Sequence, residues 1–387
     1  MTSIPFNRAT FSGNELLYLQ RAVAQGHVSG NGPFTRQAEA ILSERTNGGQ
    51  ALLTTSCTHA LEMAALLLRL SPGDEVIVPS FTFVTTASAF MLHGGTPVFV
   101  DSDPVTLNLD PDAVEAAITE RTRAVVVVHY GGLAVDLERI MALCERHGLT
   151  LVEDNAHGLF GTYRGRVLGS FGALATQSFH ETKNITCGEG GALIVNDPGL
   201  AERAEILREK GTDRSRFLRG QVDKYTWVDI GSSWVVSDLL AGVLLGQLER
   251  FDEIQARRRG VYDRYQLELA SWARENDVLM PVEFADRDHT SHVSYLRFTT
   301  LNERQAFIAH LRARDILTVF HYQPLHLSEV GLRLGGRPGQ CPVAERAGET
   351  LVRLPLFESL TEGDQTRVVD AVLSFSVNLA PSRADAS

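Results

Sequence analysis

Short apolar runs alternate with segments of helical periodicity over residues 50–200. In the run RAVVVVHY (123–130), apolar and mostly β-branched residues occupy consecutive positions, as in strands buried on both faces of a parallel sheet. We predict further strands at residues 50–55, 74–80, 96–101, 149–154, 171–179 and 190–196. We predict helices between them at residues 57–70, 83–93, 111–120 and 135–148. This alternation indicates an α/β layer structure around a mostly parallel sheet.

The pattern changes near residue 237. Apolar residues recur at three- and four-residue spacing over 237–273, which predicts one long helix. The segments at 292–300, 302–316 and 348–357 then indicate a smaller α+β unit. We therefore expect a larger domain at residues 1–250 and a smaller one at 251–387, with the long helix as connector.

The composition narrows the class of protein. A net charge of −11 argues against nucleic acid or an anionic membrane as the main partner. No apolar run reaches the roughly 18 residues that span a bilayer, and the N-terminal residues lack the pattern of a signal peptide. The four cysteines lie far apart and form no CxxC pair. We therefore expect a protein of the reducing cytoplasm, without a disulfide framework or a metal site.

Polar residues stand at the ends of several predicted strands or just beyond them. Because ligands bind outside the carboxyl ends of the strands in an α/β sheet, we expect these residues to converge on one site. They are Thr54–Thr58, Ser80–Phe83, His129–Tyr130, Glu153–His157 and Ser178–Lys183.

Two of these groups suggest a ligand that carries both a positive and a negative charge. Glu153 and Asp154 end a buried strand, where a carboxylate must be paired or solvated. They could cap a helix or form an ion pair, or one could face a cationic atom such as the pyridinium nitrogen of pyridoxal phosphate (PLP). Ser56, Cys57 and Thr58 begin a predicted helix, whose free N–H groups suit a phosphate, although a plain N-cap is the alternative. No Walker-type GxxxxGK[ST] is present, so nucleoside triphosphate hydrolysis is not indicated.

Lys183 lies between the run SFH (178–180) and the glycine-rich GEGG (188–191). The chain has 36 basic residues, of which only Lys183, Lys210 and Lys224 are lysines. An amine that loses its proton can form a Schiff base, whereas a guanidinium cannot. A surface lysine in a loop is the structural alternative. The polar strand ends nearby favour a Schiff-base lysine instead.

These blocks, in this order, resemble the nucleotide-sugar aminotransferases of the DegT type over nearly the whole chain. The resemblance is carried by VEDNAHG (152–158), SFHETKN (178–184), REKGTDRSRF (208–217), VDKYTWVDIGSS (222–233) and VFHYQPLH (319–326). It implies the fold-type-I architecture of PLP-dependent aminotransferases, with a large domain and a smaller C-terminal one. The blocks at 208–217 and 222–233 are most similar to those of family members that act on dTDP-4-dehydro-6-deoxyglucose. The resemblance thus implies a transaminase that uses this sugar and L-glutamate to make a dTDP-4-amino-4,6-dideoxyhexose of glucose or galactose configuration.

Carried over by position, the resemblance makes Lys183 the Schiff-base lysine and proton carrier, and Asp154 the partner of the pyridine nitrogen. Phe83 would stack on the ring, and His157 would lie beside it. The residues implied for the cofactor phosphate are Ser56, Cys57, Thr58, Ser178 and Ser233. The residues implied for the nucleotide sugar are Ser29, Asn31, Phe34, His180, Lys210, Arg214, Tyr322 and His326, with Lys210 and Arg214 as cations for the diphosphate.

Two positions depart from the family pattern. Many relatives have a Gly-Thr pair where this chain has Cys57-Thr58, and since both pairs present backbone N–H groups, we expect the phosphate site to be kept. Many relatives have an asparagine where this chain has Ser233, in the segment that reaches the phosphate of the partner subunit. The resemblance still implies a homodimer with shared active sites.

Four other functions compete with this one. A PLP-dependent sugar dehydratase would have histidine at the position of Lys183, and a regulator without turnover would have lost Lys183 or Asp154. An aminotransferase that acts on a different keto-sugar nucleotide would keep both. A PLP-free nucleotide-sugar reductase would need an N-terminal GxGxxG between a strand and a helix, and residues 1–40 offer only SGNGPF.

Overall fold

The computed structural model describes residues 3–377, and its main element is a seven-stranded sheet. The strand order is β1-β9-β8-β5-β4-β2-β3, and every strand is parallel to the others except β9. The bounds are β1 Gln50–Thr54, β2 Glu75–Pro79, β3 Thr96–Val100, β4 Thr122–Val128, β5 Thr150–Asp154, β8 Leu174–Ser178 and β9 Gly191–Val195. The predicted mostly parallel sheet is confirmed.

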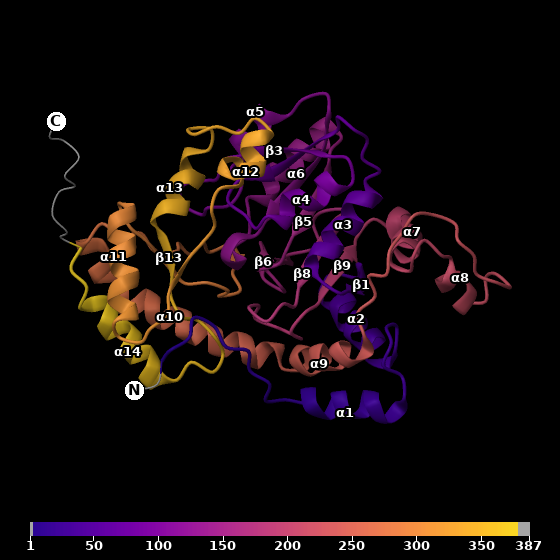
Figure 1. The fold of residues 1–387 in the computed structure, drawn as a ribbon, viewed down its shortest axis with the longest axis horizontal. Helices are drawn as coiled ribbons and strands as arrows, with labels where there is room; N and C mark the ends of the chain where they lie inside the picture. The colour runs from indigo at the N-terminus through magenta and orange to yellow at the C-terminus, as the bar shows by residue number, and fades with distance from the viewer. Residues whose placement is uncertain (1–2, 378–387) are drawn as a thin grey trace.

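Helices cover both faces of this sheet (Figure 1). Successive side chains of a strand point to opposite faces, so Val76 and Val78 pack with α3 and α4 while Ile77 packs with α5 and α6. Helix α7 joins the first face, and α1, α2 and α9 cover the second face near β1 and β9. The helix bounds are α1 Glu15–Gln25, α2 Pro33–Arg45, α3 Cys57–Leu67, α4 Thr85–Leu92, α5 Pro111–Ala117, α6 Leu137–His147, α7 Pro198–Arg208 and α9 Asp238–Glu249.

A second, antiparallel sheet of order β11-β13-β12 forms the centre of a smaller α+β unit. Leu296 and Val352 of this sheet are buried against α10, α11 and α14, and Ile4 from the N-terminal segment joins the same core. The bounds are β11 Tyr295–Arg297, β12 Val319–Phe320, β13 Leu351–Arg353, α10 Phe251–Glu275, α11 Leu301–Arg312, α13 Pro342–Thr350 and α14 Glu362–Leu373. The predicted smaller unit is therefore present.

The prediction of one helix over 237–273 is wrong, because the chain breaks at Arg250 into α9 and α10. Helix α10 begins in the core of the large sheet, where Phe251 and Ile254 are buried. From Val261 onward its buried side chains belong to the core of the small sheet. Since α10 contributes to both cores, the boundary placed near residue 250 stays a prediction.

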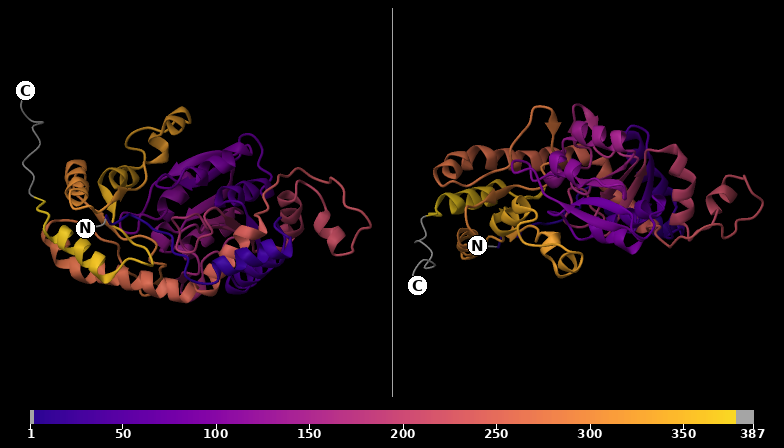
Figure 2. Two further views of the ribbon diagram at one scale, coloured as in Figure 1. Left: turned by 60° about the horizontal axis from the view of Figure 1, so that its bottom comes forward. Right: turned by 90° about the horizontal axis from the view of Figure 1, so that it is seen from above.

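Shorter elements complete the structure. Helix α8 lies on an arm that extends away from the central sheet in every view (Figures 1 and 2). A small third sheet has the order β10-β6-β7. The bounds are β6 Thr162–Tyr163, β7 Arg166–Val167, β10 Arg287–Asp288, α8 Arg214–Leu218, α12 Glu329–Arg333 and the two 3-10 turns Tyr130–Gly132 and Leu325–Leu327. Within residues 3–377, no helix is long and apolar enough to cross a membrane.

Candidate active site

The polar residues predicted to converge lie along one edge of the central sheet. Asp154 and Ser178 are the last residues of β5 and β8, which are adjacent and parallel. Ser80 directly follows β2, and His129 directly follows β4, so both lie beyond the carboxyl end of a strand of this sheet. Thr54 is the last residue of β1. The carboxyl ends of these parallel strands therefore form a common floor, where ligands of α/β sheets bind.

Asp154 is the acidic group of this floor. It is 5% exposed, and its Oδ2 accepts a hydrogen bond from the Thr86 hydroxyl at 2.8 Å. Burial raises the pKa of Asp154, and the Thr86 hydrogen bond and the charge of Lys183 act against that rise. A buried carboxylate gains most from a cationic neighbour, which matches a protonated pyridine nitrogen.

Lys183 lies in the turn after β8, where its backbone N–H donates to the carbonyl of His180 at 2.9 Å. Burial lowers the pKa of Lys183, and the electrostatic effects of Cys57 and Asp154 act against that decrease. A lysine must lose its proton before it can attack a carbonyl carbon. The environment of Lys183 therefore favours the amine that Schiff-base chemistry requires.

The phosphate end of the floor is the N-terminus of α3. The Ser56 Oγ accepts the His59 N–H at 3.1 Å and so caps the helix, while the first N–H groups of α3 keep no partner within the helix. The Cys57 sulfur lies 3.5 Å from the Thr176 hydroxyl, and burial raises the pKa of this thiol well above its ordinary value. A Cβ atom on Gly191 would come within 2.4 Å of the Cys57 nitrogen, so the glycine lets β9 approach the helix start closely.

A stack of buried histidines forms one wall of the site. The rings of His157 and His292 are stacked with centroids 4.2 Å apart, and His321 lies 6.1 Å from His157 on a nearly parallel plane. The Tyr322 hydroxyl is 3.5 Å from His157 Nε2. Burial holds the pKa of all three histidines well below the ordinary value. These rings are therefore neutral near pH 7.

Asn184 ties this wall to the lysine next to it in the chain. Its Oδ1 lies 2.8 Å from His292 Nδ1, and its Nδ2 donates to the Thr290 carbonyl at 2.8 Å and to Gln255 Oε1 at 3.3 Å. The turn that carries Lys183 is thus held against the histidine wall.

The predicted aromatic and phosphate residues differ in exposure. Phe83 is 55% exposed and pairs with the Tyr322 ring at 6.5 Å between centroids, so one face of its ring is available to a ligand. Ser178 is half-buried at the end of β8. Ser233 is exposed and forms a backbone bridge with Glu209.

The predicted substrate residues fall into two sets. Five of them lie at the outer rim. Asn31 and Arg214 both contact the Glu209 carboxylate, the latter at 3.5 Å, and Lys210 follows Glu209 with an exposed side chain. Ser29 is exposed in the loop before Asn31. His180 lies 3.6 Å from Glu189, with 42% of its side chain exposed.

Three others lie deeper. Phe34 is buried in the core beneath β1 and β9, where its ring packs on Tyr18 with centroids 5.3 Å apart. His326 has no exposed surface, and both ring nitrogens are engaged, by the Ser80 hydroxyl at 2.6 Å and the Glu345 carboxylate at 3.0 Å. Only Tyr322 of this set lies beside His157 and Phe83. The structure therefore brings Tyr322 to the site, while the side chains of Phe34 and His326 are committed to protein contacts.

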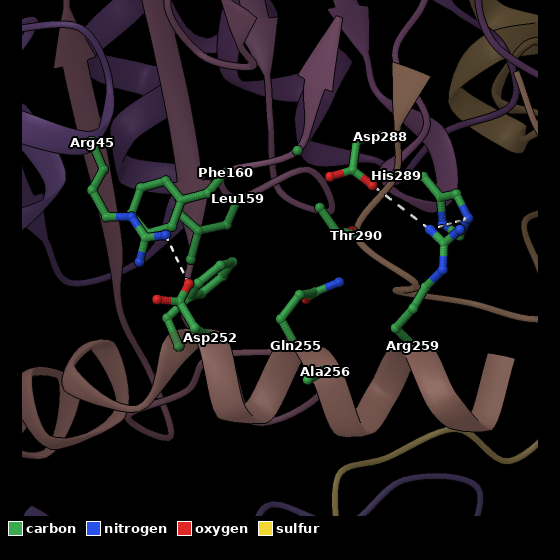
Figure 3. A pocket seen from close by; sticks show the side chains of 12 residues that line it. Arg45, Leu159, Phe160, Asp252, Gln255, Ala256, Arg259, Asp288, His289 and Thr290 are labelled. Carbon is green, nitrogen blue, oxygen red and sulfur yellow. Dashed lines mark hydrogen bonds and ion pairs between the residues drawn. The ribbon is translucent and has the colours of Figure 1, made fainter. Parts of the chain in front are cut away.

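A separate cavity of about 380 Å³ opens between α10 and the turn at 159–161 (Figure 3). Its charged groups are already paired, as in the ion pairs of Arg45 with Asp252 at 2.9 Å and of Arg259 with Asp288 at 3.7 Å. Lys183 and Asp154 do not line it. The chemistry therefore belongs to the strand-end site and not to this cavity.

The strand-end residues fit PLP. The buried Asp154 suits the ring nitrogen, the Lys183 amine suits the aldehyde, and the start of α3 suits the phosphate. Sequence reasoning missed Thr86, Asn184, His292 and His321, which contact these groups only through the tertiary fold. The block SFHETKN did contain Asn184, but no spacing linked it to His292.

Comparison with known proteins identifies the family of this chain. The chain matches the DegT/DnrJ/EryC1/StrS aminotransferase family over residues 11–373. A pleiotropic regulatory protein of Geobacillus stearothermophilus is 35% identical over 349 residues, which cover 89% of this chain and 90% of that protein.

Solved structures are similar over nearly their whole length. The aminotransferase TlmJ from Streptoalloteichus hindustanus is 34% identical with a TM-score of 0.87, covering 95% of this chain and 97% of that one. The sugar aminotransferase CalS13 from Micromonospora echinospora is 28% identical with a TM-score of 0.86, covering 96% and 99%. Spr1654 from Streptococcus pneumoniae has been solved in a PLP form and a PMP form.

Proposed function

Because this chain belongs to the DegT/DnrJ/EryC1/StrS aminotransferase family, we propose that it transfers the amino group of L-glutamate to C4 of dTDP-4-dehydro-6-deoxy-D-glucose. The protein is a PLP-dependent sugar aminotransferase with the fold-type-I architecture. What we propose is the sugar, the donor and the role of each residue. The products would be a dTDP-4-amino-4,6-dideoxy-D-hexose, of glucose or galactose configuration, and 2-oxoglutarate.

The observation that carries the mechanism is the placement of Lys183 near Asp154 with a pKa lowered by burial. When bound, PLP supplies a carbonyl carbon that accepts an amino group and a ring that takes up electron density. Asp154 would keep the ring nitrogen protonated, and its raised pKa would fall once that cation sits beside it. The first N–H groups of α3, with Ser178, would hold the phosphate.

Lys183 would carry the protons. In the first half-reaction its amine would take the proton from the α-carbon of L-glutamate, and in the second it would deliver a proton to C4 of the sugar. His157, held neutral by burial, would lie against the ring edge, fixed by His292 behind it. Phe83 would cover the ring from the open side and exclude water.

The choice of a dTDP-sugar is supported by the segment that contains the REKGTDRSRF and VDKYTWVDIGSS blocks. In this segment Lys210 and Arg214 have exposed side chains near Asn31, as expected of cations that receive a diphosphate. A different keto-sugar nucleotide is the alternative acceptor. A purely regulatory role, which the name of the Geobacillus relative brings to mind, is disfavoured because Lys183 and Asp154 are both retained.

We also propose that the catalytic unit is a homodimer in which Ser233 reaches the phosphate of the partner subunit. The arm around α8 supports this, because it exposes an unusual number of large apolar side chains: Phe217, Leu218, Tyr225, Trp227, Val228 and Ile230. Light scattering should give twice the chain mass. A monomer that turns over at full rate would disprove the shared site.

The test of the proposed function uses the PLP-loaded enzyme with L-glutamate and dTDP-4-dehydro-6-deoxyglucose. We expect an aminated sugar by NMR and one 2-oxoglutarate per amine, with no product from Lys183→Ala. The H3–H4 proton coupling then gives the epimer, because a large value means an equatorial amine and a small value an axial one. A product that has lost its C3 hydroxyl would indicate a dehydratase instead, and amination of only another keto sugar would replace the proposed acceptor.

A further inference from the structure

His326 is a motif residue whose side chain is enclosed by protein groups. Its ring and the Ser80 side chain have no exposed surface, and the Ser80 hydroxyl lies 2.6 Å from His326 Nδ1. On the other side of the ring, Nε2 lies 3.0 Å from Glu345 Oε1. A serine, a histidine and a glutamate linked in this order also form the catalytic triad of some hydrolases. Because no substrate can reach the buried Ser80 hydroxyl, these three residues must act through the chain that they hold.

That chain is the segment 321–326, which we call the strap. It leaves the small sheet after β12 and crosses to the large sheet, where the Leu325 side chain is buried in the same core as residues of β2 and α4. The Leu325 N–H donates to the Ser80 carbonyl at 2.8 Å, just beyond β2. At the other end, His321 Nδ1 lies 3.0 Å from the Tyr130 hydroxyl, just beyond β4. Both ends of the strap are therefore fixed to the large sheet.

Helix α13 supports the strap from the small unit. Glu345 and Gly348 are three positions apart, so they lie on one face of this helix. Glu345 binds His326. Gly348 lets the helix approach closely, because a Cβ atom there would come within 2.9 Å of the Tyr322 carbonyl oxygen. The helix is itself held on the large sheet by Asp101, which directly follows β3 and accepts two N–H groups of the first turn at 3.0 and 2.9 Å.

Tyr322 is the residue of the strap that lies against the active site. Its hydroxyl is 3.5 Å from His157 Nε2. Its ring meets those of Phe81 and Phe83, with centroids 5.6 and 6.5 Å away. A shift of about 1 Å in a group beside the reacting atoms can lower a rate by about a hundredfold. The residues that fix the strap therefore bear on catalysis without touching a ligand.

From these contacts we infer that His326 is a positioning residue, which fixes the strap so that Tyr322 stays against His157. This role differs from the substrate contact that the family resemblance implies for His326. A ligand of the sugar affects the sugar half-reaction through KM, whereas a positioning residue affects the rate constants of both half-reactions. The inference rests on the proposed function, because that function places His157 beside the cofactor ring.

A double-mutant cycle with Tyr322→Phe tests it. His326→Leu removes both ring contacts, while His326→Gln keeps a donor for Glu345. In single-turnover reactions of PLP-loaded enzyme, we expect His326→Leu to slow the L-glutamate half-reaction by roughly 10- to 100-fold at saturation. His326→Gln should recover part of this loss. In the Tyr322→Phe background, His326→Leu should cost less than about threefold, because the two residues act through one contact. An equal loss in both backgrounds would overturn the inference, and so would a loss confined to the KM for the sugar.

A fluorine label gives a reading that does not depend on catalysis. With Tyr322 replaced by 3-fluorotyrosine, fluorine NMR of the PLP-loaded protein reports whether this ring keeps one environment. We expect one narrow signal in the otherwise unchanged chain, and a shifted or broadened signal in His326→Leu and in Ser80→Ala. Since Ser80→Ala removes only a hydroxyl, it keeps the test available if His326→Leu does not fold. A signal that neither substitution alters would contradict the inference.

His310→Gln is the matched control. His310 is also a histidine of the small unit bound by the protein, with its Nε2 3.0 Å from the Ala371 carbonyl, but it contacts no residue of the strap. Its substitution should change neither the rate nor the fluorine signal, and an equal effect would mean that any loss of a histidine loosens the small unit. If the wild type did not react with L-glutamate, the proposed function would fail, and the fluorine signal would still decide whether His326 fixes Tyr322.

Discussion

Asp154 is a buried carboxylate at the end of β5. Asp154→Asn keeps the size of the side chain and removes the charge that would face the pyridine nitrogen. We expect the first half-reaction with L-glutamate to slow by roughly 30- to 1,000-fold, the range for loss of one preorganised electrostatic contact. The pKa of Lys183 should fall further, because the charge of Asp154 raises it in the wild type. Single-turnover absorbance measurements would report the rate.

Thr86→Val is the control for this substitution. It removes the hydroxyl that donates to Asp154 Oδ2 but leaves the carboxylate in place. We expect a much smaller loss of rate than for Asp154→Asn, with both variants melting within a few degrees of the wild type. Unchanged kinetics of Asp154→Asn would mean that this acid is structural.

At the residue scale, the sequence could predict the groups that end the strands, because Asp154 and Ser178 lie at the ends of segments whose pattern predicts strands. It could not predict His292, which is more than a hundred residues from His157 in the chain and stacks on it only in the folded structure. The family motifs also did not indicate which side chains are buried. His326 lies in one of these motifs, yet both of its ring nitrogens are bound by protein groups.

At the scale of elements, the break between α9 and α10 falls at Arg250. Its Nη2 lies 2.7 Å from Glu358, a carboxylate with only 6% of its side chain exposed, near the start of α14. Apolar spacing continues through this residue without glycine or proline, so periodicity alone predicted a single helix. The break coincides with a contact to a residue about a hundred positions away in the chain, which no local pattern contains.

Arg250→Met should therefore destabilise the protein. The substitution would leave Glu358 buried without its nearest cationic partner. We therefore expect the free energy of unfolding to fall by about 2–4 kcal/mol. Arg257 also faces Glu358, at 3.8 Å, but 54% of its side chain is exposed. Arg257→Met should thus cost under about 1 kcal/mol. Equal losses in urea denaturation would show that Arg250 has no special role at the bend.

At the scale of the whole molecule, the alternating pattern over residues 50–200 was sufficient to predict the layers and the mostly parallel sheet. The order of the strands and the antiparallel insertion of β9 were not predictable from that pattern, because β9 is apolar at consecutive positions in the same way as the parallel strand β4. The strand order and the direction of β9 depend on which strands pair, and paired strands can lie far apart in the sequence.

The whole fold also sets a pH dependence of stability. Burial lowers the pKa of several histidines, namely His93, His157, His289, His292, His310 and His321. Below their ordinary value of about 6.5, the unfolded chain binds protons that the native state does not, so the free energy of unfolding must fall as pH decreases. The raised pKa of Asp154 works in the opposite direction, but it is a single group.

Denaturant unfolding between about pH 7.5 and pH 5.5 should measure this effect. Each histidine that stays neutral in the native state contributes up to about 1.4 kcal/mol per pH unit once the pH is below 6.5. Carboxylates with a lowered pKa, such as Glu153, lose their contribution only at more acidic pH, so they do not account for a loss in this window. His321→Gln should reduce the slope by about one proton, because it removes one such ring from the wall of the active site. A stability that stays constant across this range would show that the native state binds as many protons as the unfolded chain, and that the histidine wall is charged.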